Sequence, residues 1–159
     1  MMKINLVCVG KLKEAYWRDA CLEYAKRLSQ FCTFSVTEIS ECRLPANPSA
    51  AQITAALNEE GGRLLSVCSG SLIIALCIEG KEISSLQLAE KIESYGVQGY
   101  GALSFVIGSS YGLSGRLKES SDFLFSMSPL TFPHQLARVM VMEQIYRAFQ
   151  ITHHGKYHK

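Results

Sequence analysis

The chain has 159 residues, of which 48% are hydrophobic and 19% are charged, and its formal net charge is +2. These values are typical of one soluble domain, here residues 1–159, and so small a charge does not by itself predict a nucleic-acid partner. The longest apolar run, Leu72 to Ile78, is too short to cross a bilayer. Because no secretory signal pattern opens the sequence, we expect a cytoplasmic protein without membrane contact.

The hydrophobic pattern predicts alternating strands and helices. In chain order they are a strand at 4–9, a helix at 14–30, a strand at 33–39, a helix at about 49–66, a strand at 72–78, a helix at 84–95, strands at 103–108 and 122–128, and a helix from 134 to about 151. The main strand candidates lack the in-out alternation of a half-exposed sheet, which indicates strands covered on both faces. The sequence therefore predicts an α/β fold, a mainly parallel sheet with helices on both faces. Gly61 and Gly62 weaken the second helix prediction.

The last predicted helix differs from the others because its apolar side chains surround the axis. They are Leu136, Val139, Met140, Val141, Met142, Ile145, Tyr146, Phe149 and Ile151. A helix that is apolar all round must be buried all round. One sheet covers only one side of it, so either a second subunit packs on the other side across a two-fold axis, or this is an ordinary hydrophobic core helix.

Positive charge is concentrated at the carboxyl end of the chain. Residues 124–159 carry a net charge of +3, whereas the rest of the chain sums to −1, and all four histidines lie in this last segment. The i, i+4 spacing predicts a Glu143–Arg147 ion pair and places His134 and Arg138 on one face of the last helix. We expect a polyanionic partner, if there is one, to meet this segment.

The sequence lacks the patterns of several common sites. The six cysteines, at positions 8, 21, 32, 42, 68 and 77, form no C-x-x-C pair. We therefore expect small buried hydrophobes, with neither a disulfide nor a zinc site. The fingerprints G-x-G-x-x-G and G-x-x-x-x-G-K-[ST] are also absent. Conventional dinucleotide or nucleoside-triphosphate binding is thus not expected.

Ligands of open α/β sheets bind beyond the carboxyl ends of the strands, and three predicted loops qualify: 79–85, 108–115 and 128–134. The glycines of the second loop allow its backbone to approach a ligand, although a plain turn explains them more simply. Pro129 and Pro133 stiffen the third loop. His134 follows that loop, where it is either a functional or a structural residue.

The sequence ends in GKYHK, after a His153-His154 pair. A frayed terminus or an expression scar would explain these residues, and a metal site would need a ligand spacing that is not present. Tyr157 and His158, flanked by lysines, instead combine an aromatic ring, a proton acceptor and cations. This mixture suits recognition of an unstacked RNA base.

Five segments together resemble one family. They are VGKLKEAYWRDACLEYAKRL, IEGKEISSLQLAEKI, FVIGSSYGLSG, LTFPHQLARVMVMEQIYRAFQI and the final YHK. The chain resembles the RlmH family of the SPOUT superfamily, which methylates N3 of a pseudouridine in 23S ribosomal RNA. The resemblance runs from Lys3 to Lys159, and its most specific part joins TFPHQ and the following helix to the tail. Ser109 departs from the family, which commonly has glycine there, as does Leu86, where an acidic residue is frequent.

The resemblance implies a homodimer with a C-terminal trefoil knot that holds S-adenosyl-L-methionine at the dimer interface, and an activity on 23S rRNA within the ribosome. It implies no metal. Carried over position by position, the cofactor contacts fall at Leu76, Gly108, Met127, Ser128, Pro129, Leu130, Thr131 and Phe132.

The chemistry of the implied reaction assigns roles to polar residues. The acceptor is an imide nitrogen that is protonated at neutral pH, so a base or a stabilising cation must lie near it. The candidates are His134 or His158 for the proton, Arg138, Arg147 or Lys159 for charge stabilisation, and Tyr157 for stacking on the base. Which imidazole takes the proton stays open. We hypothesise that the tail of one subunit completes the site that holds the partner's cofactor.

Two other functions compete with this one. The first is a non-catalytic ribosome- or RNA-binding factor on the same fold, which would not bind S-adenosylmethionine. The second is a hydrolase or transferase that uses the histidines with a metal, and chelators would inhibit it. The residues themselves indicate only RNA binding through the C-terminal quarter, whereas pseudouridine and the ribosome come from the resemblance.

Overall fold

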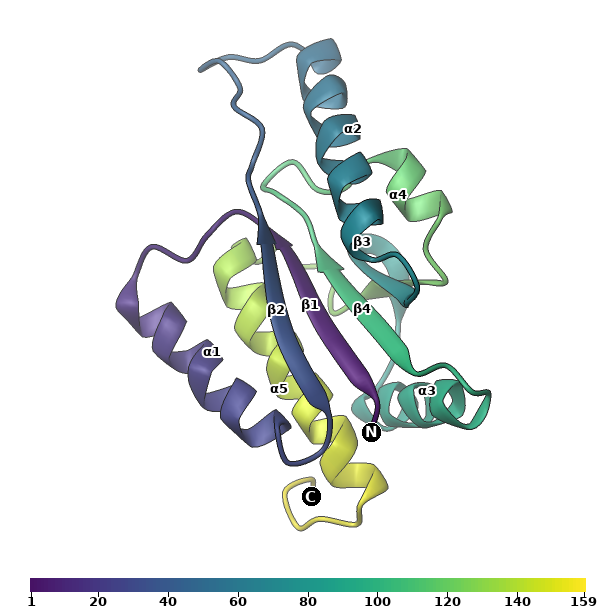
Figure 1. The fold of residues 1–159 in the computed structure, drawn as a ribbon. Helices are drawn as coiled ribbons and strands as arrows, with labels where there is room; N and C mark the ends of the chain where they lie inside the picture. Colours follow the sequence, from purple (N-terminus) through teal and green to yellow (C-terminus); the bar gives the residue numbers. More distant parts are fainter.

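The computed structural model describes residues 1–159, in which five strands and five helices alternate strictly along the chain (Figure 1). They are β1 (Lys3–Val9), α1 (Ala15–Leu28), β2 (Thr33–Ile39), α2 (Ala50–Val67), β3 (Leu72–Glu82), α3 (Ser85–Val97), β4 (Ala102–Ile107), α4 (Gly115–Glu119), β5 (Phe123–Ser126) and α5 (His134–Thr152). Capping boxes begin α2 at Ser49 and α3 at Ser84, where the side chain of Gln87 returns to the backbone of its cap.

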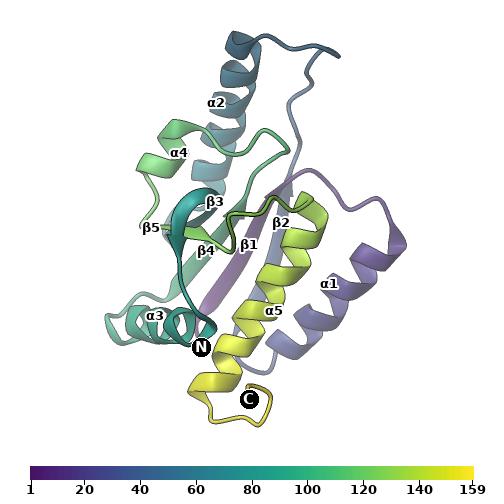
Figure 2. The ribbon, with the colours of Figure 1, turned by 180° about the vertical axis from the view of Figure 1, so that it is seen from behind.

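The strands form one parallel sheet in the order β2-β1-β4-β3-β5, which confirms the predicted fold class. Helices α1, α3 and α5 cover one face, and α2 with α4 covers the other (Figures 1 and 2). In β1, Ile4 and Leu6 belong to the first core, whereas Val7 and Val9 belong to the second. Both faces of the strand are therefore buried, which explains the continuous apolar run.

The end of β3 corrects one sequence prediction, because residues 79–82 belong to the strand and not to a loop. The strand first pairs with β5 up to Leu76, and after an irregularity pairs again from Lys81. At Gly80 a Cβ would lie 2.8 Å from the main-chain carbonyl of Leu124. Only glycine allows the two backbones to pass so closely, and no hydrophobic pattern reports such a contact.

Helix α4, which was not predicted, has only five residues and begins at Gly115, the last residue of the predicted loop 108–115. Ser114 caps it by accepting a hydrogen bond from the amide of Leu117 at 3.1 Å. The same serine packs on Gly61 of α2, where a Cβ would approach its Oγ to 2.3 Å. Helix α2 therefore continues through the glycine pair, and the missing side chain at Gly61 leaves the space that the α4 cap occupies.

Helix α5 runs opposite to the strands, from their carboxyl ends to their amino ends (Figures 1 and 2). Val141, Met142 and Ile145 are buried against the sheet, and no residue of the helix is fully exposed. Its other flank is half-buried in the single chain, so the predicted all-round burial is only partly met. No helix of the structure combines the length and apolar character needed to cross a membrane.

The two glycines of α2 give a test of this packing. Gly61→Ala should lower the free energy of unfolding by about 1–2 kcal/mol, since the new methyl group displaces the Ser114 cap. Gly62→Ala meets no atom within 4 Å and should raise it by about 0.5–1 kcal/mol through helix propensity. Urea unfolding of both variants measures the difference. Equal effects of the two substitutions would contradict the contact.

Candidate functional site

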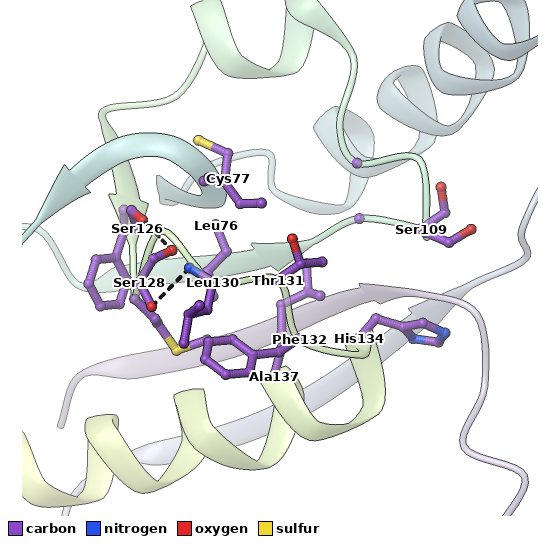
Figure 3. A pocket seen from close by; sticks show the side chains of 17 residues that line it. Leu76, Cys77, Ser109, Ser126, Ser128, Leu130, Thr131, Phe132, His134 and Ala137 are labelled. Carbon is purple, nitrogen blue, oxygen red and sulfur yellow. Dashed lines mark hydrogen bonds between the residues drawn. The ribbon is translucent and has the colours of Figure 1, made fainter.

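A pocket lies at the carboxyl edge of the sheet, between the ends of β3, β4 and β5 and the first turn of α5 (Figure 3). It is built by the ends of these three strands and the segments that follow them, together with two residues of α5. The lining residues are Leu76, Cys77, Ile78, Ile107, Gly108, Ser109, Ser110, Gly112, Phe125, Ser126, Met127, Ser128, Leu130, Thr131, Phe132, His134 and Ala137. About half of them are hydrophobic, so the pocket offers apolar walls with main-chain and hydroxyl groups between them.

The segment after β4 forms one wall from backbone. Ser109 and Gly112 pair across a tight turn, in which the Gly112 amide donates to the Ser109 carbonyl at 2.9 Å. A Cβ on Gly108 would lie 2.2 Å from the carbonyl oxygen of Gly112. Gly112 itself has a φ of 91°, a conformation that favours glycine. The glycines at 108 and 112 are therefore required for the wall itself.

The segment after β5 forms the opposite wall and holds itself in place. The hydroxyl of Ser126 donates to the carbonyl of Ser128 at 3.1 Å, and the Ser128 hydroxyl accepts from the Leu130 amide at 3.0 Å (Figure 3). Of the positions predicted to contact a cofactor, Pro129 alone does not line the pocket. The others do: Leu76, Gly108, Met127, Ser128, Leu130, Thr131 and Phe132.

His134 lines the same pocket from the first turn of α5. Burial lowers the pKa of its imidazole, and the positive charge of Arg138 lowers it further, while Glu41 opposes both effects. The ring is therefore neutral at pH 7, with a lone pair able to accept a proton. Of the predicted proton acceptors, His134 is the one that lies at the pocket in the same chain.

Arg138, one turn further along α5, is 1% exposed and does not line the pocket. Its guanidinium donates to Glu38 of β2 at 3.1 Å and to the carbonyl of Gly10 at 3.2 Å. The predicted role in stabilising charge on a substrate does not fit this position. Arg138 instead fixes the start of α5 to the ends of β1 and β2.

The tail folds back onto α5 and forms a polar cluster with it, the tail cluster, made of Glu143, Arg147, Tyr157 and His158. The predicted Glu143–Arg147 ion pair is present, with 2.6 Å between Arg147 Nη2 and Glu143 Oε1. The Tyr157 hydroxyl donates to the same oxygen at 3.2 Å, and the Arg147 guanidinium lies 4.7 Å from the centre of the Tyr157 ring. Tyr157 also packs edge-on against Tyr146. These contacts order the tail, so it is not a frayed end.

The tail residues differ in what they can do. Burial raises the pKa of Tyr157 to about 12, so its phenol stays protonated and acts as a donor. His158 Nδ1 lies 3.4 Å from Arg147 Nη1, and because a guanidinium only donates, that nitrogen must accept. Lys159 is exposed. His153 is the C-cap that follows α5, and His154 comes next with a φ of 53°, which places this pair at the helix terminus.

The pocket and the tail cluster occupy different places along α5. Thirteen residues separate His134 from Arg147, which at 1.5 Å per residue is about 20 Å along the helix axis. Figure 1 shows the tail near the amino ends of the strands, whereas the residues that line the pocket lie at their carboxyl ends. A groove on the half-buried flank of α5, lined by Val139, Met140 and Glu143 among others, lies between the two. Within one chain, therefore, the tail does not reach the pocket.

The cysteines are all free, and four of the six are buried as predicted: Cys8, Cys21, Cys32 and Cys68. Cys42 and Cys77 are half-buried instead, and Cys77 lines the pocket. Burial raises the pKa of the Cys77 thiol, so it is not an activated nucleophile. No group of three or more His, Cys, Asp or Glu side chains is arranged to hold a metal ion.

Sequence reasoning missed several residues at or near the pocket. Ile107, Phe125 and Ser126 end their strands there, and the rule that ligands bind at carboxyl ends could have included them. Glu38 and Glu41 come close through folding alone, Glu38 to Arg138 and Glu41 to His134. No local pattern marks such long-range neighbours.

Comparisons with known proteins agree with this geometry. The family model described as "Predicted SPOUT methyltransferase" matches residues 2–158. Proteins named "Ribosomal RNA large subunit methyltransferase H" from Streptococcus thermophilus and Bifidobacterium animalis subsp. lactis are each 45% identical to this chain, covering 99% of it and 100% of the relative.

Solved structures share the fold at low sequence identity. A probable methyltransferase from Bordetella pertussis Tohama I superposes with a TM-score of 0.58 at 15% identity, covering 93% of this chain and 95% of that one. A tRNA (m1G37) methyltransferase from Aquifex aeolicus gives 0.51 at 10% identity, over 92% and 69%. The match over nearly the whole chain and the close relatives place this protein in the SPOUT methyltransferase family.

Proposed function

We propose that this protein transfers a methyl group from S-adenosyl-L-methionine to N3 of a pseudouridine in 23S ribosomal RNA, on the assembled ribosome in the cytoplasm. One observation carries the proposal. The positions that a methyltransferase of this family would use for the cofactor come from three separate segments, and nearly all of them line one pocket together with His134. The names of the full-length relatives support rRNA as the substrate and catalysis as the activity, against a purely binding factor.

The pocket suits a cofactor that joins an adenine ring to a cationic chain. Leu76, Met127 and Phe132 offer apolar surface to a ring, and the segment at Gly108 brings backbone close without side chains. The serines of the segment 126–132 hold two main-chain groups in place, the Ser128 carbonyl and the Leu130 amide. When bound, S-adenosylmethionine would supply an electrophilic methyl group on its sulfonium.

The reaction places a defined demand on the protein. A bond forms between N3 and the methyl carbon, the sulfur–carbon bond breaks with its electrons passing to sulfur, and the N3 proton leaves to a base. Holding the nucleophile in line with the methyl group is worth about 7–11 kcal/mol of the barrier. His134 is neutral and lies at the pocket, so we assign it as the first candidate for the base.

We infer that the remaining groups come from a second subunit. Arg147 lies about 20 Å along α5 from His134, and Tyr157 and His158 contact it from the tail that Lys159 ends. The groove beside Val139 and Met140 leaves an apolar flank of α5 for a partner to cover. Antiparallel packing of two α5 helices across a two-fold axis would bring each tail to the other pocket. Tyr157 would then stack on the base, and Arg147 or Lys159 would stabilise its anion.

A C-terminal trefoil knot is part of the same proposal. Knots are rare enough that no hydrophobic pattern predicts one, so this feature rests on family membership.

The small positive charge supports the assembled ribosome, as opposed to free RNA, as the proposed substrate. A net charge of +3 over residues 124–159 neutralises few phosphates, so contacts with free RNA would be weak and sensitive to salt. A preformed ribosomal surface could add many weak contacts around the target base. We therefore expect the protein, supplied with labelled S-adenosylmethionine, to methylate ribosomes at least ten times faster than free 23S rRNA. A tenfold ratio corresponds to about 1.4 kcal/mol, which is the free energy that one lost base contact typically costs. Label in neither substrate would reject the enzymatic function.

The base assignment predicts a particular pH dependence. Because the pKa of His134 lies below the ordinary value of 6.5, the neutral form persists as the pH falls to 6.5, and the rate should drop only below that. His134→Asn should lower kcat by about 10²–10⁴-fold and remove this acidic limb. The measurement is kcat against pH for both proteins. A wild-type rate in the variant would exclude His134 as the base.

A further inference from the structure

A buried carboxylate on the far side of the pocket wall has an unpaired oxygen. Glu60 of α2 is 3% exposed, and its Oε1 accepts a hydrogen bond from the Cys42 amide at 3.1 Å. Its Oε2 is buried without a hydrogen-bond partner. Burial raises the pKa of this carboxyl, which shows the cost of its position. Buried polar atoms are nearly always paired, so an unpaired one calls for a role.

The first segment that Glu60 holds is the chain that leaves β2. Besides the Cys42 amide, the neighbouring Arg63 donates to the Ser40 carbonyl at 3.0 Å and contacts Cys42 Sγ at 2.8 Å. Glu41 lies within this clamped segment. Its Oε2 and the Cε1 of His134 are each 3.9 Å from the point where a Cβ of Gly10 would stand. Glu60 therefore fixes the segment that carries the carboxylate nearest to His134.

The second segment is the pocket wall after β4. Ser109 is a neighbour of the Glu60 carboxylate and lowers its pKa, yet Oε2 of Glu60 has no hydrogen-bond partner in this structure. Ser109 pairs with Gly112 in the turn beside Gly108 and lines the pocket. The other end of this segment rests on α2 through Ser114 and Gly61. Helix α2 thus supports the wall at both ends, with Glu60 at the pocket end.

We propose that Glu60 is a positioning residue for the cofactor pocket, whose unpaired oxygen accepts a hydrogen bond from Ser109 when the cofactor is bound. This inference rests on the proposed function, because it assumes that the pocket takes S-adenosylmethionine. A small shift of the wall toward α2 would pair Oε2 and fix the Gly108 backbone against the ligand. The same side chain would keep Glu41 beside His134 through the Cys42 amide.

The test measures S-adenosylmethionine binding by calorimetry, with thermal unfolding in parallel. Glu60→Ala should weaken binding about tenfold, in the range of a hydrogen bond to a charged group. Ser109→Ala should weaken it several-fold, and the double variant should bind no more weakly than Glu60→Ala alone. Glu60→Gln can still accept from Cys42 and can donate to Ser109, so it should bind within about threefold of the wild type. Glu59→Gln, an exposed neighbour on α2, is the matched control and should bind normally.

The outcomes separate the two proposals. If the wild type itself does not bind S-adenosylmethionine, the proposed function fails and this inference fails with it. If the wild type binds but Glu60→Ala binds equally well, Glu60 is structural only, whatever its melting temperature. Full additivity of the Glu60 and Ser109 effects would also overturn the proposal. Should Glu60→Ala not fold, Glu60→Leu, which keeps much of the side-chain volume but cannot bond to Ser109, replaces it in the same cycle, with additive effects again counting against the proposal.

Discussion

The attachment of α5 to the sheet determines where every candidate group can act. The buried guanidinium of Arg138 ties the first turn of this helix to Glu38 and to the Gly10 carbonyl, at the carboxyl ends of β1 and β2. Removing Glu38, which is itself exposed, would leave the buried guanidinium bonded only to the Gly10 carbonyl, at a cost of about 1.5–3 kcal/mol. Because the helix then runs back along the strands, its first residue, His134, lines the pocket, and Arg147 lies about 20 Å further along the helix, toward the amino ends of the strands.

In the proposed dimer, a site that is incomplete in one chain would become complete in the symmetric pair. The pocket contains the apolar walls, the close backbone at Gly108 and a neutral imidazole, but no free cation lines it. The candidate cation Arg147 and the phenol of Tyr157 lie together where the tail packs on the last turns of α5, and Glu143 binds both. Carrying the two halves at opposite ends of one helix would couple methyl transfer to dimerisation. In such a dimer, the partner would also cover the flank of α5 that is only half-buried in one chain.

Much of the fold could be predicted from the sequence, because buried parallel strands leave continuous apolar runs and helices leave capping signals. The bounds of β2 were predicted without error, and those of most other elements within a few residues. The elements that the sequence did not predict depend on contacts between residues far apart in the chain. The extension of β3 requires the crossing at Gly80, and α4 requires Ser114 to pack on Gly61.

For the site, the loops were predictable from strand ends, and the cofactor positions came from family resemblance. The burial of Arg138 and the position of Glu60 depend on neighbours far away in sequence, so no local pattern revealed them.

The shared site is tested most directly by mixing two inactive subunits. One would carry His134→Asn with an intact tail, and the other would lack residues 157–159 but keep His134. If each pocket uses the partner's tail, a mixed dimer has one intact site and one doubly defective site. Statistical mixing should then restore about a quarter of the wild-type rate of methyl transfer to ribosomes, because half of the dimers are mixed. No recovery from mixed dimers that have been shown to form would contradict the shared site.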